Sequence, residues 1–168
     1  APNGTAQEAL LRNVYETFKI SASQIELVEA HGTGTRLGDP IEVNTLSRVL
    51  QPAKREHGIY LGTAKANIGH TSAASGVIGL IKLVLSMEHK TIPRLPGFDR
   101  LNPKIDPLGW QISAASQSWQ PAPDHPRLAA LSSFGHSGTN THFVVQEASL
   151  DASVTSTSMQ LVPLSAKQ

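Results

Sequence analysis

The spacing of apolar residues predicts helices and strands in alternation along the chain. Apolar residues recur at a helical period from about Ala6 to Lys19, which predicts a first helix. The same period returns after Asp39. Asp39 is the expected N-cap of this second helix, and Pro40 is its expected first residue. Thr5 and Glu8 fit a capping box at the start of the first helix. Short apolar runs predict strands at 25–30, 59–64, 110–112, 128–131 and 142–146. Together these elements predict a layered α/β fold with a mixed sheet.

One further helix, predicted from Thr71 to about Glu88, is apolar on almost every side. Such a helix is buried on most of its surface. Gly76 and Gly79 lie within it, although each costs about 1 kcal/mol relative to Ala in a helix. We therefore expect a neighbouring element to approach the helix closely at these glycines. The Pro-rich stretch 92–107 is expected to form a loop.

Composition narrows the classes of function. The 168 residues make one ordinary domain, and the net charge of +1 is spread along the chain, which argues against nucleic-acid binding and against a polybasic membrane patch. The chain has no cysteine, which excludes disulfides, thiolate–metal sites and thiol catalysis by its own residues. The longest apolar run is shorter than a membrane span and contains Lys82, and we expect a soluble, cytoplasmic protein.

Three loops rich in Gly, Ser and Thr carry the candidate chemistry. The first lies within 28–40 and contains His31, the second lies within 62–70 and ends at His70, and the third covers 132–140. The two histidine-bearing loops follow predicted strands, and open α/β sheets place ligands at the carboxyl ends of their strands. The three loops are therefore expected to form the walls of one site.

These loops resemble the C-terminal half of a β-ketoacyl synthase domain, of the kind found in modular type I polyketide synthases. The matching motifs are EAHGTGT at 29–35, KANIGH at 65–70, SFG at 133–135 and GTN at 138–140, with lesser matches at 37–42 and 102–103. Order, spacing and residue types agree across all three loops. We interpret 1–149 as the C-terminal half of a ketosynthase domain and 150–168 as the start of the linker that follows such domains.

The resemblance implies a thiolase-like fold, in which two similar α/β halves stack with their central helices back to back. This chain would be the second half, with 71–88 as its buried central helix. The implied partners are a first half that carries the nucleophilic cysteine and an acyl carrier protein, and the complete domain is expected to dimerise. Substrates would be carried on the phosphopantetheine of the carrier protein, and no cofactor or metal is expected to bind the chain directly.

The implied activity is that of an acyltransferase that condenses acyl and malonyl-carrier thioesters by decarboxylative Claisen chemistry. The resemblance assigns catalysis to His31 and His70, with Lys65 as an electrostatic support. Imidazoles suit a developing enolate oxygen because each can donate a hydrogen bond near neutral pH. The sequence leaves open which histidine polarises the thioester carbonyl and which acts on the leaving carboxylate or a water. It also leaves open the partner of Lys65, because a glutamate that the family often has at Ser72 is absent.

Further residues are expected to bind the substrate or its pantetheine arm: Thr33, Thr35, Phe134, His136 and Asn140. The threonine hydroxyls would hydrogen-bond the amides of the arm, and the loop from Phe134 to Asn140 would face the cysteine. The family usually has Phe-Gly where this chain has His136-Ser137, and the aromatic commonly gates the acyl pocket. The alternative function is therefore a non-condensing piece that binds acyl-carrier cargo or only transfers acyl groups.

Other interpretations of the same residues are weaker. A serine hydrolase with Ser137 as its nucleophile is disfavoured, because a nucleophile elbow needs Gly two residues after the serine and this chain has Thr139 there. A metal site built from the histidines of the three loops has no supporting carboxylate or spacing. Thr33 and Thr35 as turn residues, and Lys65 as a surface ion-pair residue, remain structural alternatives. The chain is expected to be either one piece of a ketosynthase divided between two polypeptides or part of a longer synthase.

Overall fold

A five-stranded mixed sheet forms the centre of the protein in a computed structural model that describes residues 2–135 and 137–148. The strand order is β4-β2-β1-β6-β7, with bounds β1 (Leu27–Glu29), β2 (Ile59–Gly62), β4 (Trp110–Gln111), β6 (Leu128–Phe134) and β7 (Asn140–Gln146). The first four strands in this order run parallel, and β7 is antiparallel to β6. The mixed sheet expected from the sequence is confirmed, although β6 and β7 are longer than predicted.

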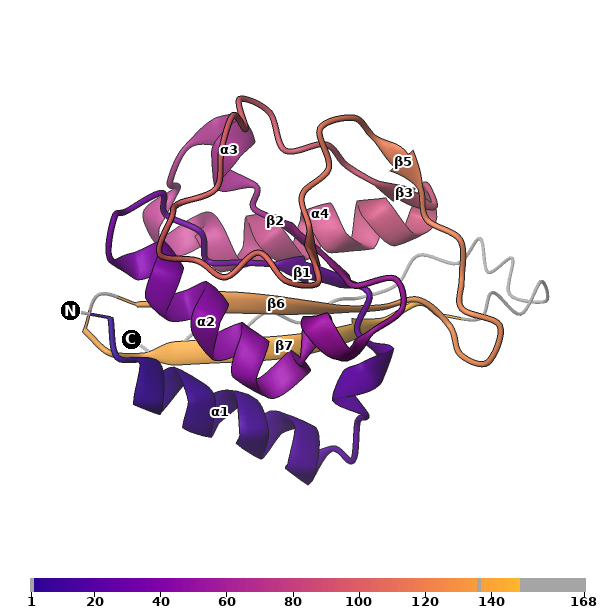
Figure 1. The fold of residues 1–168 in the computed structure, drawn as a ribbon, viewed down its shortest axis with the longest axis horizontal. Helices are drawn as coiled ribbons and strands as arrows, with labels where there is room; N and C mark the ends of the chain where they lie inside the picture. The colour runs from indigo at the N-terminus through magenta and orange to yellow at the C-terminus, as the bar shows by residue number, and fades with distance from the viewer. Residues whose placement is uncertain (1, 136, 149–168) are drawn as a thin grey trace, which may run out of the picture.

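Helices cover both faces of this sheet (Figure 1). α1 (Gly4–Thr17) and α2 (Gly38–Leu50) pack together on one face, and α4 (Ser75–Glu88) packs on the other. Alternate strand residues serve the two cores, since side chains along a strand point to opposite faces. Val28 and Ala130 belong to the core beneath α1 and α2, whereas Leu27 and Ala129 belong to the core beneath α4.

Short elements connect these layers. They are the 3₁₀ turns η1 (Ala22–Gln24), η2 (Pro52–Lys54) and η3 (Ser72–Ala74), the single-turn helix α3 (Lys65–Ile68), and the two-stranded antiparallel sheet of β3 (Thr91–Ile92) and β5 (Gln117–Ser118). The β3–β5 pair was not predicted, because strands of two residues carry no usable periodicity. The stretch 92–107, expected to be a loop, contains no helix or strand apart from Ile92, the last residue of β3.

The predicted helix starts are wrong by two to four residues. α1 is capped by Asn3, whose side chain accepts the N–H of Ala6 at 3.1 Å, and Glu8 pairs with Arg12 and Arg48 instead of closing a capping box with Thr5. A cap depends on which short polar side chain reaches the free N–H groups, and Asn3 does so here in place of Thr5.

The starts of α2 and α4 also differ from the predicted ones. α2 begins at Gly38, so Asp39 lies inside the helix, where it accepts the N–H of Gly34 at 3.1 Å. Pro40 is then the third helical residue rather than the first. The apolar helix begins at Ser75 rather than Thr71, because η3 occupies the intervening turn.

The close approach expected at the two glycines of α4 is confirmed. A Cβ at Gly79 would lie 2.7 Å from Leu131 Cδ1, and a Cβ at Gly76 would lie 3.2 Å from Ser133 Oγ. Burial of α4 is one-sided within this chain, however. Its outer face exposes large apolar side chains: Val77, Leu80, Ile81, Val84 and Leu85. Among the described residues, no helix combines the length and apolar character needed to cross a membrane.

Candidate active site

The two histidines singled out by the sequence lie next to each other. His31 follows β1, and His70 follows β2 and the short α3. Because β1 and β2 are parallel neighbours, both loops leave the same edge of the sheet. The imidazole ring centroids are 5.5 Å apart, with an interplanar angle of 85°. Residues 39 positions apart in the chain therefore present two imidazoles to one small volume.

Backbone donors determine the tautomer of both rings. Nδ1 of His31 accepts the N–H of Phe134 at 3.4 Å, and Nδ1 of His70 accepts the N–H of Ser72 at 3.1 Å. A backbone N–H can only donate, so each Nδ1 carries no proton. In the neutral rings the proton is therefore on Nε2, and both imidazoles are hydrogen-bond donors through that atom.

The electrostatic setting keeps His31 neutral near pH 7. Partial burial lowers the pKa of His31 to about 4, and the neighbouring basic groups of Lys65 and His70 act in the same direction. An imidazole with this pKa donates a hydrogen bond without carrying a net charge.

Glu42 holds the loop that begins at His31. This buried side chain from α2 accepts the N–H of His31 at 2.7 Å through Oε1 and the N–H of Gly32 at 3.0 Å through Oε2. Burial raises the pKa of Glu42 to about 7, against the lowering effect of these two hydrogen bonds. No role for Glu42 was predicted, although an acidic residue between two apolar positions of a packed helix was an available signal.

Two buried carboxylates act electrostatically on Lys65, but among the described residues neither forms an ion pair with it, so the partner of Lys65 stays open. Burial lowers the pKa of Lys65, whereas the negative charges of Glu29 and Glu42 raise it. Glu29 is itself buried at the end of β1, where it forms an ion pair with Lys82 of α4 at 2.7 Å. Sequence analysis missed this pair, since 53 residues separate its members.

The loop between His31 and α2 is tightly built. Gly32 has a φ of +48°, and a Cβ at this position would lie 2.8 Å from Cβ of Thr63. Thr35 Oγ1 accepts the N–H of Gly38 at 3.0 Å, so this hydroxyl also terminates the loop at the start of α2. Thr33 is half-buried in the same loop, whereas Thr35 is exposed.

The third loop closes the site from the β6–β7 turn. The ring of Phe134 lies with its centroid 5.6 Å from that of His31, and Phe134 is paired in register with Asn140 across the turn. The N–H of Gly135 donates to the carbonyl of Thr139 at 2.6 Å. His136 lies outside the described residues, so the expectation placed on it stays a prediction.

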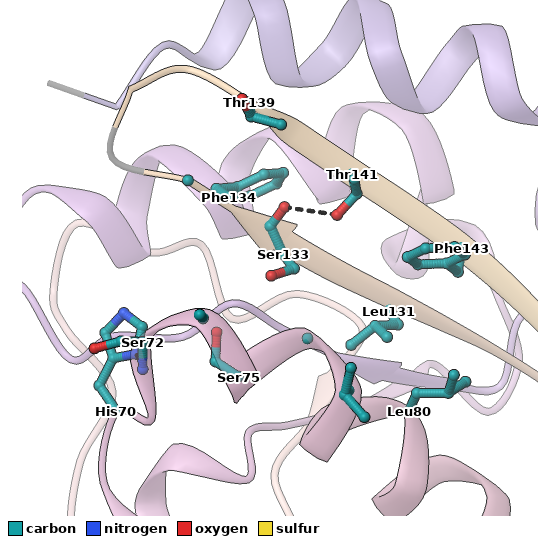
Figure 2. A pocket seen from close by; sticks show the side chains of 14 residues that line it. His70, Ser72, Ser75, Leu80, Leu131, Ser133, Phe134, Thr139, Thr141 and Phe143 are labelled. Carbon is teal, nitrogen blue, oxygen red and sulfur yellow. Dashed lines mark hydrogen bonds between the residues drawn. The ribbon is translucent and has the colours of Figure 1, made fainter. Parts of the chain in front are cut away.

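A cleft of about 650 Å³ opens beside His70, between the start of α4 and the β6–β7 strands (Figure 2). Ser72, Ser75, Ser133 and Thr141 supply hydroxyls to its wall, and the apolar part is formed by Leu80, Leu131 and Phe143. Within 2–135 and 137–148, no group of three His, Asp or Glu side chains is arranged to hold a metal ion.

Comparisons with known proteins agree with this arrangement. Residues 1–99 match the family model described as beta-ketoacyl synthase, C-terminal domain. The chain is 45% identical over 154 residues to erythronolide synthase EryA3 of Saccharopolyspora erythraea, covering 88% of this chain and 5% of that protein. It is 42% identical over 169 residues to polyketide synthase GfsA of Streptomyces halstedii, covering 97% of this chain and 2% of that protein.

Solved structures lead to the same family. The ketosynthase from module 6 of the bacillaene synthase of Bacillus subtilis 168 superposes with a TM-score of 0.85 and 41% sequence identity, covering 90% of this chain and 27% of that chain. The chain thus spans a small part of the synthases and about a quarter of the solved ketosynthase that it matches. It belongs to the β-ketoacyl synthase family, as the C-terminal part of a polyketide-synthase ketosynthase with a thiolase-like fold.

Proposed function

We propose that this chain supplies the two imidazole donors of a ketosynthase that carries out decarboxylative Claisen condensation. The observation that carries the proposal is the convergence of two Nε2 donors, His31 and His70, from neighbouring strand ends. Hydrogen-bond donors fixed in advance around a developing oxyanion are the largest single contribution in many enzymes. Because its Nδ1 is held by backbone, each ring needs no reorganisation to donate.

The proposed reaction begins with an acyl group on a cysteine thiol of the first half. A malonyl thioester on an acyl carrier protein loses carbon dioxide, and the electrons of the broken C–C bond form an enolate whose oxygen accepts from the two imidazoles. The enolate carbon attacks the acyl carbonyl, a C–C bond forms, and the cysteine leaves as thiolate. His31 and His70 stabilise the enolate oxygen in this scheme, and burial, assisted by the positive charge of Lys65, keeps His31 neutral by lowering its pKa.

The remaining roles follow the resemblance. Thr33 and Thr35 would bind the pantetheine arm of the carrier protein, while Phe134, His136 and Asn140 would line the loop that faces the acyl-cysteine. The first half would cover the outer face of α4, and the complete domain would dimerise. Residues 1–149 would form the ketosynthase part and 150–168 the start of a linker, which lies outside the described residues.

The test uses the complete ketosynthase domain that contains this chain as its C-terminal part. In His31→Ala and His70→Ala variants, condensation with malonyl-carrier should fall by about 10²-fold to 10³-fold, the effect of losing one oxyanion donor. Acylation of the partner cysteine, followed by mass spectrometry of the intact protein, should persist. The control is His57→Ala, an exposed histidine before the start of β2.

Two outcomes would change the proposal. Unchanged condensation in either variant would remove that histidine from the mechanism. A wild-type domain that acylates its cysteine but never releases carbon dioxide from malonyl-carrier would favour the non-condensing, acyl-transferring alternative.

A further inference from the structure

A buried carboxylate behind the two imidazoles connects the loops that carry them. Glu29 is the last residue of β1, two positions before His31, and its residue is only 2% exposed. Its Oε1 accepts the N–H of Ala64, which immediately precedes α3, and its Oε2 accepts from Lys82 Nζ at 2.7 Å. One side chain therefore bridges β1, the β2–α3 connection and α4.

α4 is shaped to receive this carboxylate. A Cβ at Gly79 would lie 3.2 Å from Cγ of Glu29, so a larger residue on this turn would press on the Glu29 stem. Lys82 follows three positions later on the same face of the helix. Its ammonium also lies close to β2, because a Cβ at Gly62 would be 3.4 Å from Nζ.

The position of His70 depends on contacts from outside its own segment. α3 contains only four residues, and a single helical turn is not stable by itself. It is followed by Gly69, whose φ is +77°, and then by His70. The hydrogen bond from Ala64 to Glu29 anchors the N-terminal side of this short segment to the strand that carries His31.

We propose that Glu29 is a positioning residue, which sets the spacing between the two imidazoles by anchoring Ala64 while Lys82 neutralises its charge. The inference rests on the proposed function, since the spacing matters there for the condensation step. Glu29 acts through the backbone of Ala64 and does not touch the substrate.

Two double variants of the complete ketosynthase domain test this role. Both remove the charges of Glu29 and Lys82, and they differ in whether the side chain at position 29 can still accept a hydrogen bond. Glu29→Gln/Lys82→Gln keeps an oxygen that can accept from Ala64, and Glu29→Leu/Lys82→Met has no acceptor. The first pair should keep kcat for condensation within about threefold, and the second should lose about thirtyfold, since misplacement of catalytic groups by about 1 Å can cost about 10²-fold. KM for malonyl-carrier and the rate of cysteine acylation should stay within about twofold in both.

A control pair shows the effect of losing a buried ion pair elsewhere. Arg127 and Glu147 are joined at 2.7 Å near the opposite end of β6 and β7 from the histidines. Arg127→Gln/Glu147→Gln should leave kcat unchanged. The positioning role would be overturned if the two Glu29 double variants had the same kcat, whether unchanged or equally reduced.

A second readout does not depend on condensation. Amide hydrogen exchange of the peptide covering 62–68 should accelerate in Glu29→Leu/Lys82→Met and stay slow in Glu29→Gln/Lys82→Gln, with the rest of the domain unchanged. Equal exchange in both pairs would overturn the anchor. If the wild-type domain acylates but does not condense, the proposed function fails, and this exchange experiment still decides whether Glu29 holds Ala64.

Discussion

At the scale of single residues, histidines in this chain differ sharply in what surrounds them. His142 is buried between two hydroxyls, with Nε2 3.1 Å from Tyr15 Oη and Nδ1 3.0 Å from Ser132 Oγ. Burial lowers the pKa of His142 to about 4. Both ring nitrogens are occupied within the core, so this histidine joins α1 to the sheet. Within 2–135 and 137–148, by contrast, no group forms a hydrogen bond with Nε2 of His31 or His70.

The stability contribution of His142 should depend on pH. Its pKa in the fold, about 4, lies below its ordinary value of 6.5, so the unfolded chain binds a proton first as the pH falls. The contribution is present above about pH 6.5 and is lost as the pH falls to about 4, with a total of about 3 kcal/mol. The difference in the free energy of unfolding between wild type and His142→Gln, measured by denaturant titration at low protein concentration, should shrink across this window.

The measurement compares wild type with a variant because Glu42 changes the free energy of unfolding with pH in the opposite direction to His142. Burial raises its pKa to about 7, so its contribution weakens as the pH rises from its ordinary value toward 7. This effect is common to wild type and variant and cancels. The exposed His57, changed to Gln, is the control for replacing a histidine outside the core. A pH-independent difference for His142→Gln would contradict the burial argument.

At the scale of elements, α4 shows how closely a helix and a sheet can approach. Gly79 faces Leu131 and the stem of Glu29, whereas a Cβ at Gly76 would meet only Ser133, with Oγ at 3.2 Å and Cβ at an ordinary contact distance of 3.4 Å. Both positions gain helix propensity, about 1 kcal/mol, when Gly is replaced by Ala. They differ in whether the neighbouring atoms can move.

Gly79→Ala should therefore destabilise the fold, by about 1 to 2 kcal/mol, because overpacking against the ion-paired Glu29 outweighs the gain in propensity. Gly76→Ala should be neutral or stabilising, since the Ser133 side chain can rotate away. Denaturant unfolding of the two variants measures the contrast. Equal effects from the two substitutions would contradict the contact geometry at Gly79.

At the scale of the whole molecule, the outer face of α4 groups several exposed large apolar side chains of the described residues on one helix. Val77 is 60% exposed, Ile81 52% and Val84 48%, and these side chains lie along one helix. Contiguous apolar surface of this kind marks an interaction site in soluble proteins. The first half of a ketosynthase is the partner that we propose for it.

The chain on its own should consequently self-associate, which sedimentation velocity at increasing concentration will detect. Val77→Gln/Ile81→Gln/Val84→Gln should reduce self-association and also weaken pairing with a separately expressed first half. The control is Phe18→Gln, which removes an isolated exposed ring, 69% exposed, at the end of α1. A wild-type chain that remains a cooperative monomer at all concentrations would contradict the prediction.

How much was predictable depends on whether a feature is local. The strands of the five-stranded sheet and the convergence of the loops that carry His31 and His70 were predicted, because apolar periodicity and motif spacing are properties of short segments. The helix starts at Asn3, Gly38 and Ser75 were not, since they depend on which neighbouring group satisfies the free N–H groups. The roles predicted for all the site residues remain predictions: His31, His70, Lys65, Thr33, Thr35, Phe134, His136 and Asn140.

The sequence by itself determined the order of elements, the family and the residue types that reach the site, because each is written in contiguous stretches of the chain. Only the tertiary structure decided the distance between the two imidazoles and the nitrogen that carries each proton. It also decided that Glu29, Glu42 and Lys82 support the loops. The donor to His31 is the amide of Phe134, 103 residues away, and the cation on Glu29 comes from 53 residues away. Such contacts arise only when packing brings distant segments together, and no local pattern encodes them.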